Sequence, residues 1–380
     1  MRLLSPLLLI AGAWSSALAS QGDRSPAFQR CVSTCVQACP SLPLPSWSLW
    51  PCSAECAYAC TTALTDFALL FPRRLPTSPL TPEEAFDAER LLGPGGELEG
   101  LDLGRQVQFF GKWPFRRLFG TQELLAVAFS LANLWAHAKG WRDLGRMDVT
   151  SVEATTLRRL YQANALVGIN TWVWSVVFHT RDTAWTEKAD YFSAAASTLF
   201  GLWLAGVRAG GLYKDQRGKR RWRTLTQLAF SVVFIAHCTY LSGGRFDYSY
   251  NMAFNVAFGL AQILLWSLWG LTNFLAHPPV SPLSPSPSNP PPRRSKHYLK
   301  PLVPVWLLFA CTALELFDFE PVPSNWRLLD AHALWHASTV GVVRIWYRFL
   351  EHDVWWVEGA IRGEQGMGGA GGVAAKRRVQ

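Results

Sequence analysis

Two pairs of side chains in this sequence have the residue types and the spacing that metal chemistry requires. Ser175 and His179 lie four residues apart, and so do His332 and His336. Residues four apart share one face of a helix, so one helix could present both His332 and His336 to a single metal ion. Asp190 follows His179 and adds a carboxylate. These five residues are the candidate site, and their chemistry is metal binding and proton transfer.

The elements that must position these residues are long apolar runs. Apolar residues make up 49% of the chain, with 19 Trp and 22 Phe, and few charges interrupt the runs, which is typical of a membrane protein. Seven runs are long enough to span a bilayer core. They lie near 120–138, 160–180, 189–209, 223–242, 250–275, 300–318 and 331–350. We expect an all-α membrane protein with seven transmembrane helices and a small disulfide-rich luminal N-terminal region.

The basic residues between the runs indicate how the helices are oriented. The loops after the first, third and fifth runs contain sixteen Lys and Arg residues, and the three alternate loops contain four. Basic residues concentrate on the cytosolic side of membrane proteins, so we expect a luminal N-terminus and a cytosolic C-terminus. The net charge of +9 is then a topology signal, and no nucleic-acid partner is expected. Contact of the basic cluster 217–223 with anionic lipid stays open.

This orientation places the candidate residues at one surface of the membrane. The second run ends at the luminal side with His179, and the third begins there with Asp190. The seventh run begins at the same side with His332 and His336. Three histidines and a carboxylate are therefore expected to converge at the luminal face, which favours a metal site. The alternatives are histidines that only hydrogen-bond and a Ser175 that only packs two helices.

Residues 1–20 are typical of a cleaved secretory signal peptide. Arg2 precedes a short apolar stretch, and small residues end at Ser20. The stretch is too short to cross a bilayer comfortably, so a first transmembrane helix is the weaker interpretation. The region that follows is therefore expected in an oxidising compartment.

Six of the eight cysteines lie close together in the luminal region 21–115. They recur every fourth residue in two groups: Cys31, Cys35, Cys39, Cys52, Cys56 and Cys60. In an oxidising compartment this cluster predicts three disulfides between two short helices, with the pairing left open. A zinc site is the alternative, but CxxC spacing and a nearby histidine are both lacking. Cys238 and Cys311 lie in apolar runs and are expected to be packing residues.

The remaining segments are rich in Pro, Gly or Ser, and we expect much of them to be disordered. They include most of residues 41–111, the cytosolic linker 278–297 and the Gly-rich end of the cytosolic tail 351–380. The core of the protein is then a transmembrane domain over residues 116–350.

Several short motifs carry a resemblance to a known family. They are Gly111 to Phe115 with Gln122 and Glu123, Ser175 to Tyr191, Arg245 to Asn251, Leu314 to Phe319 and Leu329 to His336. These motifs resemble the family of post-GPI attachment to proteins factor 3, the GPI-specific phospholipases A2. That family belongs to a superfamily of membrane hydrolases with alkaline ceramidases and progestin/adiponectin receptors. Residues 62–105 and 278–292 are longer than the family pattern.

The resemblance implies a reaction for the candidate site. It implies removal of the sn-2 acyl chain from the GPI lipid of GPI-anchored proteins, in the Golgi membrane, with no obligate protein partner evident. His179, His332 and His336 would bind Zn²⁺, which activates water and polarises the ester. Asp190 would transfer protons, and Ser175 would hydrogen-bond the oxyanion or orient the water. Asp330 is a candidate partner for a histidine N–H.

Two other functions fit the same five residues. A ceramidase-like amidase is one, because the residues alone do not choose between an ester and an amide. The other is a receptor-like or chaperone-like membrane protein in which the histidines and a fourth ligand hold a structural zinc ion. The family-specific cysteine region favours the ester-cleaving branch.

Overall fold

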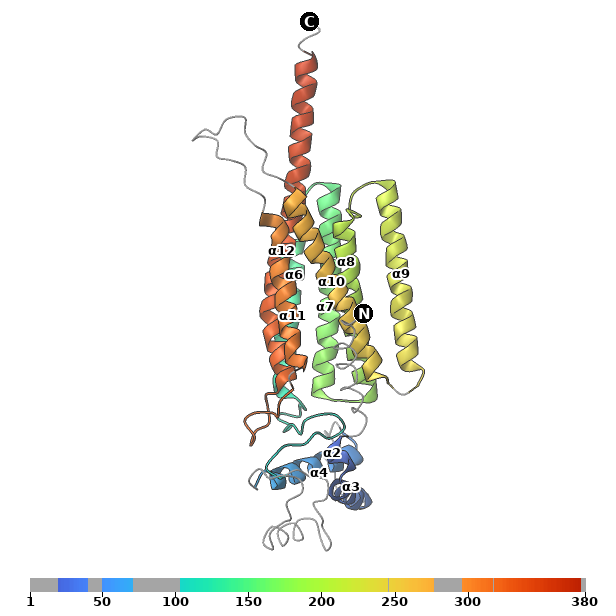
Figure 1. Cartoon of the computed structure of the whole chain (residues 1–380), viewed down its shortest axis with the longest axis vertical. Coiled ribbons are helices and arrows are strands. Elements are labelled where there is room, and N and C mark those ends of the chain that lie inside the picture. Colours follow the sequence, from blue (N-terminus) through green and yellow to red (C-terminus); the bar gives the residue numbers. More distant parts are fainter. Residues whose placement is uncertain are drawn as a thin grey trace, which may run out of the picture. The chain divides into compact units, whose positions relative to one another are not determined.

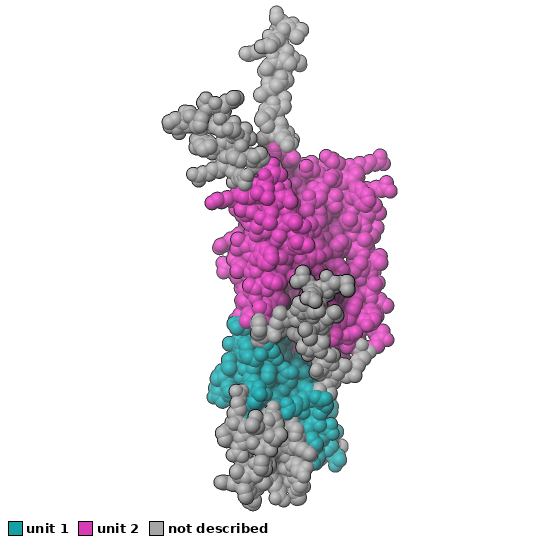
Figure 2. Space-filling view, in the orientation of Figure 1, with its two compact units in different colours: residues 1–127, 179–182, 317–334 teal, residues 128–178, 183–316, 335–380 magenta. Residues whose placement is uncertain are grey.

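The computed structural model describes residues 20–39, 50–70, 103–244, 246–276, 296–316 and 318–376. The predicted signal peptide, except Ser20, and residues 278–295 of the predicted linker 278–297 lie outside these residues. The chain forms two compact units, which Figure 2 shows in teal and magenta. Unit 1 comprises residues 1–127, 179–182 and 317–334, and unit 2 comprises the rest. Over the described residues both units are helical, with isolated β-bridges and no strand.

The described N-terminal part of unit 1 contains the helices α2 (Gln21–Arg24), α3 (Pro26–Ala38) and α4 (Cys52–Ala68), and three disulfides join α3 to α4. The bonds are Cys31–Cys60, Cys35–Cys56 and Cys39–Cys52. From one bond to the next, the cysteine of α3 lies one helical turn later and the cysteine of α4 one turn earlier. The two helices therefore run antiparallel. The prediction of two short helices joined by three disulfides is confirmed, and the structure resolves the pairing that the spacing left open.

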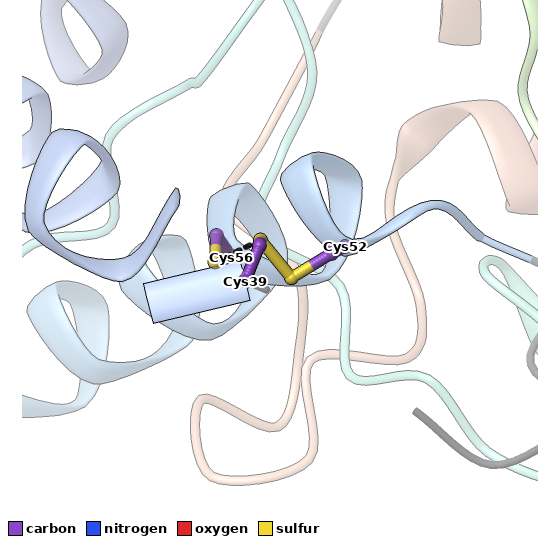
Figure 3. A group of neighbouring side chains, drawn as sticks. All are labelled: Cys39, Cys52 and Cys56. Carbon is purple, nitrogen blue, oxygen red and sulfur yellow. Dashed lines mark hydrogen bonds between the residues drawn. A yellow bond between two sulfur atoms is a disulfide. The ribbon is translucent and has the colours of Figure 1, made fainter. Parts of the chain in front are cut away.

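The cysteine cluster does not offer a metal site. The sulfur of Cys39 lies 4.0 Å from that of Cys56, so that Cys39, Cys52 and Cys56 form a compact group of sulfur atoms. Figure 3 shows that Cys39 is already bonded to Cys52. Cys56 is bonded to Cys35. A metal requires thiolates, so stacked disulfides explain the short distance.

An apolar cluster and a set of ion pairs hold unit 1 together. Phe28 of α3 and Leu64 and Phe67 of α4 pack with Phe109 from the following segment. That segment, residues 103–123, makes two tight turns in which Gly111 and Gly120 adopt φ of 76° and 71°. Backbone of this kind favours glycine.

Asp66 of α4 is the centre of the ion pairs of unit 1. It accepts hydrogen bonds from Arg116 at 2.8 Å and from Arg327 at 2.6 Å. The Arg327 side chain is fully buried. One carboxylate therefore fixes two segments that are distant in sequence, one with Arg116 and the other with Arg327.

Unit 2 is a bundle of long helices that run side by side (Figure 1). They are α6 (Leu124–Gly145), α7 (Val152–Thr180), α8 (Ala184–Ala209), α9 (Arg217–Ser242), α10 (Tyr248–Ala276), α11 (Leu302–Leu316) and α12 (Ala331–Lys376). A short 3₁₀ helix, η2 (Lys296–Leu299), precedes α11. A helix thus occupies each position where an apolar run predicts one. Differences lie at polar ends: α7 starts before residue 160, and α12 continues as a helix into the predicted tail.

Four helical segments are long and apolar enough to cross a membrane by composition alone. They are Ala184–Ala209, Arg217–Ser242, Tyr248–Ala276 and Lys296–Leu314. The helices α6, α7 and α12 do not meet this criterion over the described residues. These three bury polar side chains inside the protein, among them Asn133, Ser175 and His336. Inward-facing polar groups lower the mean hydropathy of a helix, and they are characteristic of functional sites in membrane proteins.

A buried polar network joins several helices of the bundle to one another. Asp353 of α12 is fully buried and forms a bidentate pair with Arg208 of α8, with two N···O distances of 2.7 Å. The hydroxyl of Tyr161 in α7 donates to the same carboxylate at 2.6 Å, and His297 of η2 lies 3.0 Å from it. The guanidinium of Arg208 also lies over the ring of Trp269 in α10. The charge of Asp353 is therefore compensated from several helices at once, which such deep burial requires.

Candidate metal centre

The three predicted histidines come together at the ends of two helices. His179 is in the last turn of α7, and His332 and His336 are in the first two turns of α12. Within unit 1, the Nε2 atom of His179 lies 3.3 Å from Nε2 of His332. His336 follows His332 by one helical turn, and one ring nitrogen from each histidine lies within 4.8 Å of the others. His179 and His336 are buried, and His332 is half-buried.

This group of nitrogens fits a metal ion. A tetrahedral zinc ion with Zn–N distances of about 2.0–2.1 Å needs ligand nitrogens about 3.3 Å apart. The Nε2 atoms of His179 and His332 have this separation. The donor set, three imidazoles with no thiolate, is that of catalytic zinc sites, which keep a coordination position for water.

A carboxylate orients the first histidine. Glu123, directly before α6, lies 2.6 Å from Nδ1 of His179 through Oε2, and both side chains are buried. Its backbone N–H also donates to the His179 carbonyl at 3.0 Å. Burial alone would raise the pKa of Glu123, but the interactions with His179 and Lys112 outweigh it and hold that pKa well below its ordinary value. Glu123 therefore carries a negative charge beside the ring, and Nε2 is the nitrogen that His179 directs at His332.

A hydroxyl orients the third histidine. Within unit 2, Ser130 of α6 lies 2.8 Å from Nδ1 of His336 and 3.0 Å from the hydroxyl oxygen of Ser175. Asn133, one turn further along α6, donates to the backbone carbonyl of His336 at 2.8 Å. Nδ1 of His336 is thus engaged, and Nε2 is the nitrogen that it can offer to a metal. Ser175 is buried on α7, one turn before His179.

Neither of the two predicted carboxylates belongs to the group formed by the three histidines. Asp190 is half-buried in α8, and among the described residues it is not one of the group whose ligand atoms cluster. Asp330 precedes α12, and its carboxylate accepts a hydrogen bond from the backbone N–H of Ala333 at 2.8 Å. Burial raises the pKa of Asp330. Its carboxylate acts as the N-terminal cap of the helix that carries two of the histidines.

Glu123 and Ser130 are the residues that sequence reasoning missed. Gln122 and Glu123 belong to a motif of the family pattern, but their chemistry did not follow from their type. The signal for Glu123 was its position: it is a carboxylate at the predicted luminal start of the first run, the side at which His179 ends the second. Ser130 gave no signal, because a serine within an apolar run is most often a packing residue.

Comparisons with known proteins place the chain in a family. Residues 43–354 match the Per1-like family. The chain is 36% identical over 344 residues to "Protein PER1 homolog" of Schizosaccharomyces pombe, which covers 87% of this chain and 86% of that protein. It is 33% identical over 362 residues to "GPI-specific phospholipase A2-like PGAP3" of Homo sapiens, covering 92% of this chain and 94% of that protein. No solved structure matches the chain. The protein belongs to the Per1-like family.

Proposed function

We propose that this protein remodels GPI anchors by hydrolysing the sn-2 acyl ester of the GPI lipid, with a metal ion held by its three histidines. The observation that supports this most directly is the group formed by His179, His332 and His336, whose ring nitrogens lie within 4.8 Å of one another. The relatives named as GPI-specific phospholipase A2-like cover more than nine-tenths of the chain, which supports the substrate class. The products would be a lyso-GPI lipid and a free fatty acid.

We also propose that all seven long helices cross a membrane of the Golgi, with the N-terminus luminal and the C-terminus cytosolic. The 22 residues of α6 are about 33 Å long, enough for a bilayer core. The helices α7 and α12 are longer still. The excess of basic residues in alternate loops supports this orientation. With it, α7 ends and α12 begins at the luminal surface, where GPI lipids reside.

The chain's own residues would divide the work of ester hydrolysis as follows. A bound metal would supply Lewis-acid polarisation of the ester carbonyl and activation of a water molecule. His179, His332 and His336 hold the metal. Asp190 accepts the proton of the attacking water and returns it to the leaving alkoxide as the acyl C–O bond breaks. The hydroxyl of Ser175 donates to the oxygen on which negative charge develops.

The test is a cell-based measurement of the lipid product. Cells that lack this activity would express wild type, His336→Ala or Asp190→Ala, and mass spectrometry would determine the sn-2 chain of their GPI-anchored proteins. We expect wild type to restore remodelling and both variants to fail at equal protein level. Asp148→Ala, in the exposed loop between α6 and α7, is the matched control and should behave as wild type. Full remodelling by His336→Ala would show that the histidines are not catalytic.

The same experiment separates the competing functions. Ceramide hydrolysis by wild type, with no change in the GPI lipid, would indicate an amidase. Metal binding without any lipid product from purified protein would indicate a structural zinc site.

A further inference from the structure

Each oxygen of the Glu123 carboxylate has its own partner. Oε2 lies 2.6 Å from Nδ1 of His179, and Oε1 lies 3.5 Å from Nζ of Lys112. The carboxylate therefore cannot rotate without losing one of the two contacts. Only 7% of the Glu123 side chain is exposed, so water does not readily replace either partner.

Lys112 is itself fixed at two points. Its ammonium group forms an ion pair with Asp182 at 2.6 Å, two residues after the end of α7. Its backbone pairs with Phe109 across the tight turn that contains Gly111, with N···O distances of 2.8 and 2.9 Å. The turn therefore places the lysine, and the lysine in turn holds the glutamate.

The backbone around Glu123 clamps the end of α7. The N–H groups of Gln122 and Glu123 donate to the carbonyls of Thr180 and His179 at 3.1 and 3.0 Å. The side-chain amide oxygen of Gln122 accepts from the N–H of Asp182 at 3.2 Å. The last carbonyls of a helix have no partner within the helix, so this segment satisfies them while it aligns Glu123 with the ring.

We propose that Glu123, held by Lys112, is the positioning residue that fixes the orientation and tautomer of His179 for metal binding. The inference rests on the proposed metal-dependent function. The carboxylate 2.6 Å from Nδ1 makes that nitrogen the hydrogen-bond donor, directs Nε2 outward and makes it a stronger ligand. The Nδ1 atom of His336 contacts the hydroxyl of Ser130, which is a weaker hydrogen-bond partner than a carboxylate. The Glu123 contact should therefore contribute more to metal affinity than the Ser130 contact.

The test measures metal binding rather than activity. Purified full-length protein in detergent would be loaded with Zn²⁺ or Co²⁺, and affinity would be determined by competition with a chelator. We expect Glu123→Gln to lower the affinity about 10- to 100-fold and Ser130→Ala to lower it less. Lys112→Met should weaken binding in the same direction, because Glu123 loses the partner of its Oε1.

A spectroscopic signature separates positioning from a general loss of structure. The visible absorption of bound Co²⁺ reports on its ligands, so it should change in Glu123→Gln. Glu320→Gln is the matched control: Glu320 is a carboxylate of unit 1 that binds Arg105 and the backbone of Gln106. The metal affinity and the Co²⁺ spectrum of Glu320→Gln should equal those of wild type. Glu123→Asp keeps the charge and should recover part of the affinity.

The possible outcomes lead to different conclusions. Wild-type affinity and spectrum in Glu123→Gln would overturn the positioning role while leaving the metal site intact. A wild-type protein that binds no metal would instead overturn the proposed function. If Glu123→Gln does not fold, Lys112→Met and Glu123→Asp decide the question, and wild-type affinity in both would overturn the inference.

Discussion

Ser130 and Ser175 are neighbouring serines in unit 2 with different environments. Ser130 binds Nδ1 of His336, whereas Ser175 reaches Ser130 at 3.0 Å and precedes His179 by one turn of α7. A hydroxyl that supports a histidine should affect metal affinity. A hydroxyl that stabilises developing charge should affect the rate of the chemical step and leave metal binding unchanged.

We therefore predict that the two serines affect different quantities. Ser175→Ala should lower kcat about 100-fold or more, with unchanged metal content, because one oxyanion donor is lost. Ser130→Ala should lower metal affinity and, once saturated with metal, recover most of the activity. Kinetics on a GPI lipid and metal analysis of the purified variants would measure both effects. Wild-type kcat in Ser175→Ala would return Ser175 to the role of a packing residue.

At the scale of elements, one polar network joins four helices. The carboxylate of Asp353 receives hydrogen bonds from Arg208 and Tyr161 and lies beside His297. Ion pairs as deeply buried as this one cost desolvation energy, and removal of one partner leaves the other charge without compensation.

Arg208→Ala should therefore destabilise the protein strongly, by about 3–5 kcal/mol. Arg220 forms the matched control, because its pair with Asp215 is exposed. Arg220→Ala should cost about 1 kcal/mol or less. Denaturant or thermal unfolding in detergent would measure both. Equal effects of the two substitutions would show that the buried pair does not secure the bundle.

The apolar runs predicted the positions of the helices well and their polar ends poorly. The run 250–275 corresponds to α10, Tyr248–Ala276, because no charged residue interrupts this helix. The beginning of α7 was missed, because Glu153 and Arg158 interrupt the apolar pattern there. Cysteine spacing predicted the disulfides but left the pairing open, since six cysteines allow fifteen combinations.

The convergence of the three histidines was predictable from the sequence, and the residues that contact them were not. Helical spacing and the distribution of basic residues predicted that the three histidines converge, because both can be read directly along the chain. The contact of Glu123 with His179 depends on how a turn before α6 meets the end of α7. A single sequence does not specify such a tertiary contact, and the carboxylate that the sequence suggested as a histidine partner was Asp330.

At the scale of the whole molecule, the orientation in the membrane determines which lipids can reach the histidines. The sequence contains no Asn-x-Ser/Thr sequon, so the natural chain carries no N-glycosylation signal to report topology. The proposed orientation depends on the distribution of basic residues and on the disulfides, which form in oxidising compartments.

Engineered sequons would test this orientation. A sequon placed within residues 71–102 should be glycosylated, and one placed within 278–292 should not, because only the first segment would be luminal. The readout is a mobility shift in gels that an endoglycosidase reverses. Glycosylation of the second sequon alone would invert the topology and place the histidines at the cytosolic surface.

The continuity of α12 has a consequence for how this protein can evolve. One uninterrupted helix, Ala331–Lys376, carries His332 and His336 near its start and Asp353 further along. Each residue added or removed between His336 and Asp353 would turn one of them about 100° around the helix axis relative to the other. No such change could keep both the histidines and the partner of Arg208 in place. We therefore expect the length of this interval to be invariant among relatives, even where its apolar side chains differ.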